Sequence, residues 1–385
     1  MKNLNKKEVI YFVIFIFGIL SIVFLLFSIF IKKLIFHYNF LYIVGIVVGV
    51  IFSIIGFLLF IFEKYHMFKR PGLFSLKVNF IEALLIFFMI FLLCGTGFLI
   101  YYYTSLEDFE EFSIGIYVSS SSDPFNFISG NINNPVLTYS DVDDVKAGFV
   151  ADPFLIFDNS NYYMFFEVFN LESHQGDIGL AVSNDGFNWS YSKIVLDESF
   201  HLSYPCVFKW EDEYYLIPET YQKNSVRLYK ADDFPYTWSF VKTLLDGRDF
   251  VDNTIFEYNE TWWLFTSNTN SDVLYLYYSS KPLGPWLGHP KNPIIVDDPN
   301  FARPGGNVIV FDNLIVRFCQ DDYPYYGNQV WAFEITKLTK TEYEEHRIGD
   351  KPVLKGFENW NTLGMHHISP LQLDDGSWIA SVDGN

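Results

Sequence analysis

The hydrophobic pattern divides the chain into two unlike parts. Three long apolar runs, over 9–31, 40–62 and 80–103, contain a single charged residue, Glu82. A membrane-spanning helix needs roughly 20 apolar residues, because the hydrocarbon layer is about 30 Å thick and a helix rises about 1.5 Å per residue. The pattern predicts a membrane domain over 1–103 with three transmembrane α-helices. A cleaved signal peptide is the alternative for the first run, and it would leave the other two spans in place.

After a short linker over 104–111, the chain changes to short aromatic and β-branched runs that repeat about every 50 residues. Each repeat is an apolar run, a polar turn and a second aromatic run, and the five copies lie at 153–167, 205–219, 253–267, 307–319 and 369–383. Further strand-like runs follow the first four copies at 177–183, 225–231, 273–279 and 329–335. This pattern predicts an all-β five-bladed β-propeller over 112–385, with 112–118 closing the ring. A β-sandwich, the alternative, would not repeat at a fixed period.

The first three repeats share one internal spacing, in which an opening residue is followed fifteen positions later by a closing residue; the pairs are Asp152 and Glu167, Tyr204 and Glu219, and Asp252 and Ser267. The first two strands of a blade form an antiparallel hairpin beside the central channel, so these residues share one rim. The last two repeats add further polar residues there, namely Arg303, Gln320, Asp321, His366, His367 and Asp383. The spacing therefore predicts a cluster of these side chains at the channel mouth.

Carboxylates gathered at one mouth repel one another, and this raises some of their pKa values, as acid–base catalysis requires. Inverting glycoside hydrolysis uses two carboxyl groups roughly 6.5–9.5 Å apart, which adjacent blades can supply. Aromatic residues make up 20% of the chain and suit sugars, whose apolar faces pack on rings. The sequence has no P-loop, dinucleotide-binding or HExxH motif, and the adjacent His366 and His367 lack metal-ligand spacing. We therefore expect no cofactor and no metal.

The distribution of charge predicts the orientation in the membrane. Seven basic residues lie in the N-terminal segment and the second loop, against Lys32 and Lys33 in the first loop. Basic loops stay cytoplasmic, so the propeller is expected on the extracytoplasmic or lumenal side. Residues 1–103 hold nine basic and three acidic residues (net +6), and 104–385 hold 17 and 42 (net −25). So acidic a domain excludes nucleic acid as a partner. Cys206 and Cys319 are expected as buried free thiols, although a disulfide between them is also allowed.

Several short phrases of the propeller agree in order and spacing with one known family; they are Phe149-Val-Ala-Asp-Pro153, His201-Leu-Ser-Tyr-Pro205, Ile217-Pro-Glu-Thr220, Ala302-Arg-Pro-Gly-Gly306, Gly364-Met-His-His367 and Ser381-Val-Asp-Gly384. Over about 112–385 the chain resembles the N-terminal propeller domain of plant glucosamine inositolphosphorylceramide transferase, itself similar to glycoside hydrolase family 43. In those enzymes a separate glycosyltransferase domain follows the propeller. Because this sequence stops at Asn385, the resemblance implies the propeller and not the sugar-transfer activity.

The resemblance also implies roles for individual residues. The family 43 pattern matches Asp152 as the catalytic base and Asp252 as the residue that tunes the pKa of the acid. At the position of the acid in blade four the chain has Arg303, which cannot donate a proton near neutral pH and would suit an anionic ligand. Glu219 is the nearest substitute for the acid.

Two hypotheses follow from these matches. In the first, the protein is a membrane-bound carbohydrate-active enzyme with Asp152, Asp252 and Glu219 as its catalytic residues. In the second, it is a non-catalytic propeller that binds a glycan or glycolipid head group for a separate glycosyltransferase. The candidate substrate-binding residues are Glu167, Tyr204, Arg303, Gln320, Asp321, His366, His367 and Asp383.

Overall fold

The computed structural model describes residues 112–120, 123–311 and 314–385. The three predicted transmembrane runs lie outside these residues. Within the described ranges no helix is both long and apolar enough to cross a bilayer. The helical elements found there are two 3-10 turns, η1 (Tyr139–Asp141) and η2 (Tyr221–Lys223).

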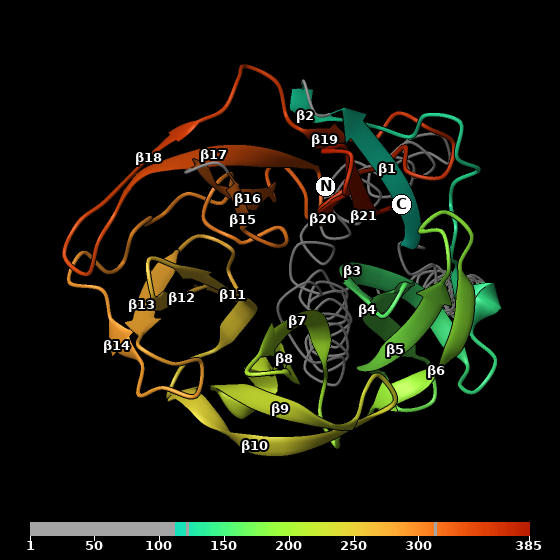
Figure 1. The fold of residues 1–385 in the computed structure, drawn as a ribbon, viewed down its shortest axis with the longest axis horizontal. Coiled ribbons are helices and arrows are strands. Elements are labelled where there is room, and N and C mark those ends of the chain that lie inside the picture. Colours follow the sequence, from blue (N-terminus) through green and yellow to red (C-terminus); the bar gives the residue numbers. More distant parts are fainter. Residues whose placement is uncertain (1–111, 121–122, 312–313) are drawn as a thin grey trace, which may run out of the picture. The chain divides into compact units, whose positions relative to one another are not determined.

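Five antiparallel sheets stand around a ring, which confirms the predicted all-β five-bladed propeller (Figure 1). Blade one consists of β3 (Ala147–Asp158), β4 (Asn161–Asn170), β5 (Gln175–Ser183) and β6 (Ser190–Leu196). Blade two consists of β7 (Ser203–Trp210), β8 (Glu213–Glu219), β9 (Ser225–Asp233) and β10 (Thr237–Asp246). Blade three consists of β11 (Phe250–Tyr258), β12 (Thr261–Asn268), β13 (Tyr275–Ser279) and β14 (Leu287–Gly288).

Blades four and five are less regular. Blade four consists of β15 (Ile309–Phe311), β16 (Leu314–Asp321), β17 (Gln329–Leu338) and β18 (Tyr343–Arg347), with β19 (Leu354–Lys355) also paired to β17. Blade five joins the two ends of the described chain, because β20 (Ile368–Gln372) and β21 (Trp378–Gly384) pair with β1 (Ser113–Ser120) and β2 (Asp123–Ile128). The pairing of β1 with β21 confirms that 112–118 closes the ring, and β2 adds a further strand to the blade.

The first three blades repeat one hairpin in detail. Their two-residue turns place both residues at positive φ, at 159–160, 211–212 and 259–260. Two successive positive φ values define the type I′ turn, whose twist matches that of the flanking strands. In each hairpin the residue before the opening residue pairs with the closing residue; the pairs are Ala151 with Glu167, Ser203 with Glu219, and Val251 with Ser267. The equal spacing in the sequence therefore corresponds to equal register.

The core lies between the blades and is largely aromatic and aliphatic. Phe154, Phe165, Leu216 and Leu264 belong to one cluster that joins the first three blades and are fully or almost fully buried. At the centre of the ring, polar groups join the inner strands, as where Tyr204 of blade two bonds to Thr254 of blade three at 2.7 Å. The cysteines of this domain follow the expectation of buried free thiols and form no disulfide.

Candidate functional site

The opening residues of the first three blades share an unusual backbone conformation. Asp152, Tyr204 and Asp252 have φ values of 52°, 45° and 51°, in the left-handed region. Non-glycine residues adopt this region at a cost of roughly 1–3 kcal/mol, and such strain is concentrated at functional sites. Each lies at a β-bulge inside its strand, which begins some residues earlier than the sequence indicated. A bulge re-aims side chains, and here the same bulge recurs at one rim of three blades.

A carboxylate from the preceding blade accepts the backbone N–H of each of these residues. Asp383 accepts from the amide of Asp152 at 2.9 Å, and Asp152 accepts from that of Tyr204 at 3.2 Å. Glu219 accepts from the amide of Asp252 at 3.1 Å. These bonds support the strained backbone and hold the carboxylates beside one another, as the predicted rim requires. They also give each of these three carboxylates a structural role that the sequence did not reveal.

His366 lies between two of these carboxylates. Its Nε2 is 3.2 Å from Oδ1 of Asp152, and its Nδ1 is 3.2 Å from Oδ1 of Asp383. Burial alone would lower the pKa of His366, but the two carboxylates raise it to about 9, so the ring is charged at neutral pH. Burial alone would raise the pKa of Asp152, but the bond and charge of His366 outweigh it and hold that pKa below its usual value. Asp152 is therefore an ionised carboxylate.

These three residues are also the group that could hold a metal ion in the described part of the chain. Their ligand atoms lie within 4.8 Å of one another. In this arrangement, however, each ring nitrogen of His366 already faces a carboxylate oxygen. The imidazolium supplies the positive charge that a cation would bring. A metal would have to displace that proton and reorient the ring, so the donor set fits a charged histidine better than an ion.

Arg303 neutralises a second group of carboxylates. Its Nε donates to Asp252, and its Nη2 lies 3.4 Å from Asp252 and 3.8 Å from Glu219. Its Nη1 donates to Ser271 at 3.2 Å, so all three guanidinium nitrogens have protein partners. An anionic ligand, expected for Arg303 from the sequence, would have to compete with Asp252. Gln320 donates to the same carboxylate at 2.6 Å.

The pKa values of Glu219 and Glu167 are raised well above their usual range, and those of Asp252 and Asp383 are raised too. Burial raises the pKa of Glu219 well above its usual range, as does the Asp252 carboxylate, and Arg303 offsets only part of this. Burial also raises the pKa of Glu167, with Asp152, Glu219 and Asp252 adding to it through their charges. The bonds from the backbone of Tyr204 to Asp152 and from that of Asp252 to Glu219 place these carboxylates along one rim. The mouth thus holds an ionised Asp152 beside groups that favour the protonated form.

Glu167 faces His201, which the sequence indicated only as part of a family motif. The Nδ1 of His201 accepts the backbone N–H of Gly176 at 2.9 Å, so in the neutral ring the proton is on Nε2. That nitrogen lies 3.6 Å from Oε1 of Glu167, a buried oxygen without a hydrogen-bond partner among the described residues. Burial lowers the pKa of His201 to about 4, so it is neutral at physiological pH.

Two of the predicted site residues, Tyr204 and Asp321, point away from the carboxylate cluster, and His367 lies at its edge. The hydroxyl of Tyr204 accepts the backbone N–H of Gly306 at 2.7 Å, deep in the channel, and the tyrosine is fully buried. His367 is also fully buried and packs edge-on against Phe154 and Tyr204, but its Nδ1 lies 3.6 Å from Oδ1 of Asp152. Asp321 accepts from Gln329 at 2.7 Å and from the indole of Trp331 at 3.2 Å, within its own blade. Tyr204 and Asp321 thus support the fold around the mouth, whereas His367 also lies beside Asp152.

Tyr326 is a further residue at the mouth that the sequence did not indicate. Its ring is 5.2 Å from the ring of His366, and the guanidinium of Arg303 lies 5.2 Å from its centre. The tyrosine is 43% exposed. An exposed ring beside buried charged groups could pack on the apolar face of a sugar. The sequence Tyr325-Tyr326-Gly327 could have indicated Tyr326 as a site residue, because aromatic residues next to a turn glycine remain accessible.

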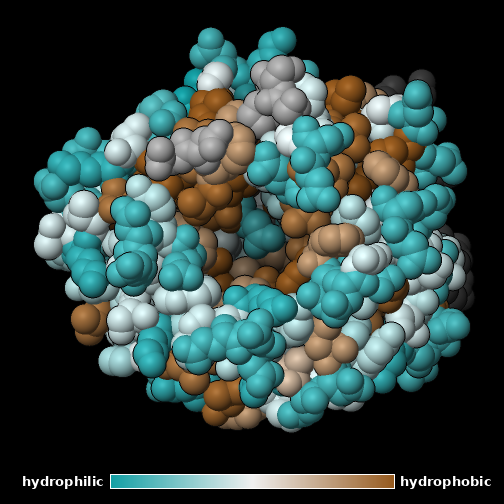
Figure 2. All heavy atoms as spheres, in the orientation of Figure 1, coloured by the Kyte–Doolittle hydropathy of each residue, from teal (hydrophilic) through white to brown (hydrophobic). Residues whose placement is uncertain are grey.

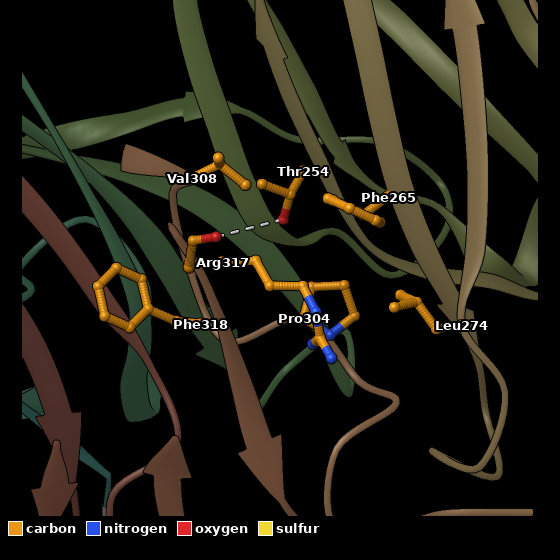
Figure 3. Close-up of a pocket in the computed structure, with 8 residues that line it drawn as sticks. Thr254, Phe265, Leu274, Pro304, Val308, Arg317 and Phe318 are labelled. Carbon is orange, nitrogen blue, oxygen red and sulfur yellow. Dashed lines mark hydrogen bonds between the residues drawn. The ribbon is translucent and has the colours of Figure 1, made fainter. Parts of the chain in front are cut away.

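The face drawn in Figure 2 is hollowed at the centre of the ring, with hydrophilic residues inside the hollow and apolar ones around it. A separate small gap lies between blades three and four, lined mainly by apolar side chains such as Phe265, Leu274 and Phe318 (Figure 3). It has no space for even a water-sized molecule, whereas small-molecule sites measure roughly 300–1,000 Å³. Arg317 reaches this gap with its alkyl stem, while its guanidinium bonds to Glu345. We assign no chemistry to the gap.

The fold is that of a glycoside hydrolase-like β-propeller. A candidate glycoside hydrolase from Parabacteroides distasonis shares this fold with a TM-score of 0.50 at 13% identity, over 65% of this chain and 94% of that one. Residues 118–385 match the family of the N-terminal domain of glucosamine inositolphosphorylceramide transferase 1, and the chain belongs to this family.

Curated relatives show the same family membership. The transferase of that name from Oryza sativa subsp. japonica is 40% identical over 266 residues, which are 66% of this chain and 36% of the relative. The one from Arabidopsis thaliana is 36% identical over 66% of this chain and 35% of its own length. The chain thus spans about a third of the length of the curated relatives it matches.

Proposed function

We propose that this protein is a membrane-anchored, carbohydrate-active propeller whose channel mouth takes a glycan or a glycolipid head group. The observation that carries this proposal is the cluster of buried carboxylates in two unlike electrostatic environments. His366 keeps Asp152 ionised, whereas Glu219 and Glu167 favour the protonated form. In a cluster that served folding alone, Oε1 of Glu167 would not be expected to be buried without a hydrogen-bond partner among the described residues, because such a group costs stability.

The same environments support hydrolysis of a glycosidic bond. Carboxyl groups whose pKa values are pushed apart can divide the roles of base and acid between them. In the inverting reaction Asp152 would take a proton from water as the water attacks the anomeric carbon. Glu219 would donate its proton to the oxygen of the leaving sugar. Asp252, held by Arg303, would keep the pKa of Glu219 high through its negative charge.

A second candidate function is favoured by one specific observation. Asp383, Asp152 and Glu219 each accept a backbone N–H from the next blade, so their burial also has a structural reason. In this reading the propeller binds a glycan or glycolipid head group without cleaving it and presents it to a separate glycosyltransferase. The names of the relatives, which are transferases, agree with such a partner.

The two candidates are separated by amide variants of the full-length protein in detergent. Asp152→Asn and Glu219→Gln keep an oxygen that can accept the backbone N–H, and they remove the charge or the acidic proton. Asp350→Asn is the matched control, because the Asp350 side chain is fully exposed. Binding of oligosaccharides and release of reducing sugar are measured for all four proteins.

If the site is catalytic, the two mouth variants lose turnover by about 10²–10⁴-fold and the control keeps it. If the site only binds, no protein releases sugar, and the mouth variants alone change affinity. Wild-type protein that neither binds nor cleaves any glycan or glycolipid head group would refute both candidates.

The membrane anchor and its orientation are part of the proposal and rest on the sequence. The three apolar runs support the anchor, and the seven-to-two distribution of basic residues supports a propeller outside the cytoplasm. A reporter fused after Asn385 is expected to be inaccessible from the cytoplasm. Cleavage of the propeller by a protease supplied on the cytoplasmic side of intact membranes would contradict this orientation.

A further inference from the structure

The most exposed large apolar side chains of the described residues lie on two loops. Phe357, Tyr323 and Leu363 are 71%, 64% and 61% exposed, more than any other large hydrophobic residue in that part of the chain. Tyr325 and Tyr326 follow Tyr323 closely and are 52% and 43% exposed. Single exposed apolar residues are normal on protein surfaces, whereas contiguous ones mark a contact surface. The question is therefore whether these five residues form one patch.

Three glycines bring the two loops together. A Cβ on Gly364 would lie 2.1 Å from the carbonyl oxygen of Gly327, so the loop backbones touch there. A Cβ on Gly356 would lie 3.3 Å from the backbone nitrogen of Gly364. The chain neighbours of these glycines are Tyr326, Phe357 and Leu363. The five exposed residues therefore lie on two adjoining loops, and we call them together the apolar patch.

The apolar patch is continuous with the channel mouth. The ring of Tyr326 lies 5.2 Å from that of His366, the residue between the two mouth carboxylates. Phe112, the first described residue, packs there too, with its ring 4.7 Å from that of His366. A Cβ on Gly327 would lie 3.3 Å from the Phe112 ring. The chain therefore reaches the propeller beside both the mouth and the patch.

We propose that the apolar patch docks on the surface of a lipid bilayer beside the channel mouth. This inference rests on the membrane anchoring and the carbohydrate site proposed above. The linker over 104–111 spans roughly 26–29 Å when fully extended, so a propeller tethered by residue 103 stays within reach of the bilayer surface. Tyrosine is also typical of the membrane–water interface.

The net charge of the propeller limits the kinds of lipid surface on which the apolar patch can dock. Residues 104–385 carry 17 basic and 42 acidic residues, net −25. Such a domain is repelled by anionic lipids, whereas an apolar patch of tyrosine, phenylalanine and leucine can insert at the head-group level of a neutral one. The surface that fits is therefore zwitterionic or uncharged.

The test uses full-length protein in phosphatidylcholine vesicles, with an environment-sensitive fluorophore on a cysteine introduced by Leu363→Cys or, separately, Phe357→Cys. Both proteins carry Cys94→Ser. Burial raises the pKa of the Cys206 and Cys319 thiols to about 12, so these two cysteines stay unlabelled. The matched control is Leu287→Cys, because Leu287 is 55% exposed on blade three.

We expect nitroxide-bearing lipids to quench the labels at 363 and 357 at least threefold more than the label at 287, and aqueous iodide to show the reverse order. Equal quenching at all three positions would overturn the proposal. A second result would also overturn it, namely labels that nitroxide lipids do not quench and that a soluble oligosaccharide protects from iodide. The patch would then bind a free glycan. Protein that does not float with the vesicles would overturn the docking together with the anchor. Failure of the carbohydrate site is seen separately, in labelled proteins that are quenched in this order but that, like the wild type, neither bind nor cleave any glycan or glycolipid head group.

Discussion

Replacing His366 by glutamine tests whether a buried charge holds the mouth together. His366 lies between Asp152 and Asp383, 3.2 Å from an oxygen of each, and all three side chains are at least nine-tenths buried. Burial opposes the charged ring, yet the two carboxylates raise its pKa from 6.5 to about 9. Glutamine keeps a polar side chain of similar size and removes the charge. The variant would therefore leave two buried carboxylates without a compensating cation.

The magnitude follows from the shift in pKa. A rise from 6.5 to about 9 corresponds to about 3 kcal/mol, at about 1.4 kcal/mol for each pKa unit. Because the pKa is higher in the folded state, this contribution is fully present below pH 6.5 and is lost as the pH rises to about 9. Removing one partner of a buried ion pair costs about 3–5 kcal/mol. For a domain of this size that lowers Tm by roughly 6–20 °C at pH 6.

The assay is thermal unfolding of the full-length protein followed by tryptophan fluorescence at pH 6 and pH 9. All nine tryptophans lie beyond residue 188, so the signal reports on the propeller alone. The Tm of the wild type should fall between pH 6 and pH 9. The Tm of His366→Gln should be lower than that of the wild type at pH 6 and should differ little between the two pH values. His346→Gln is the control, because His346 is 3.2 Å from Glu334 but 58% exposed, where ion pairs contribute little. A wild type and a His366→Gln variant with the same pH dependence would refute the reasoning.

The remaining predictions concern stability and use the same fluorescence signal. Tyr204→Phe should cost about 1–3 kcal/mol, because the buried amide of Gly306 loses its acceptor, and an unchanged Tm would contradict this. Gly306→Ala should abolish folding, because its Cβ would lie 1.7 Å from the carbonyl oxygen of Ile368; a normal yield of folded protein would show that the inner strands can move apart. Arg317→Met should cost about 3–5 kcal/mol, since Glu345 would remain without its bidentate partner, and Glu345→Gln should restore part of that loss.

Local features of the chain determined the architecture. The polar turns between aromatic runs recur at a fixed spacing, and a hairpin with a two-residue turn fixes its own register. Asp152 and Glu167 could therefore be assigned to one rim from their separation in the sequence alone, as could Asp252 and Ser267. The strand that closes the ring could be predicted too, because an unpaired run at 112–118 has to satisfy its backbone groups.

The tertiary structure alone decided how the side chains of different blades meet. Asp152 and His366 are more than 200 residues apart, and no spacing within a repeat tells which oxygen faces which ring nitrogen. The partners of Arg303 could not be predicted from the sequence for the same reason, because its guanidinium could have faced a ligand instead of Asp252. His201 became visible as the neighbour of Glu167 only once blade two was placed beside blade one. The repeat in the sequence determines which residues each blade places at the rim. Packing between blades determines which charged groups pair, and this pairing sets the pKa values on which the proposed chemistry depends.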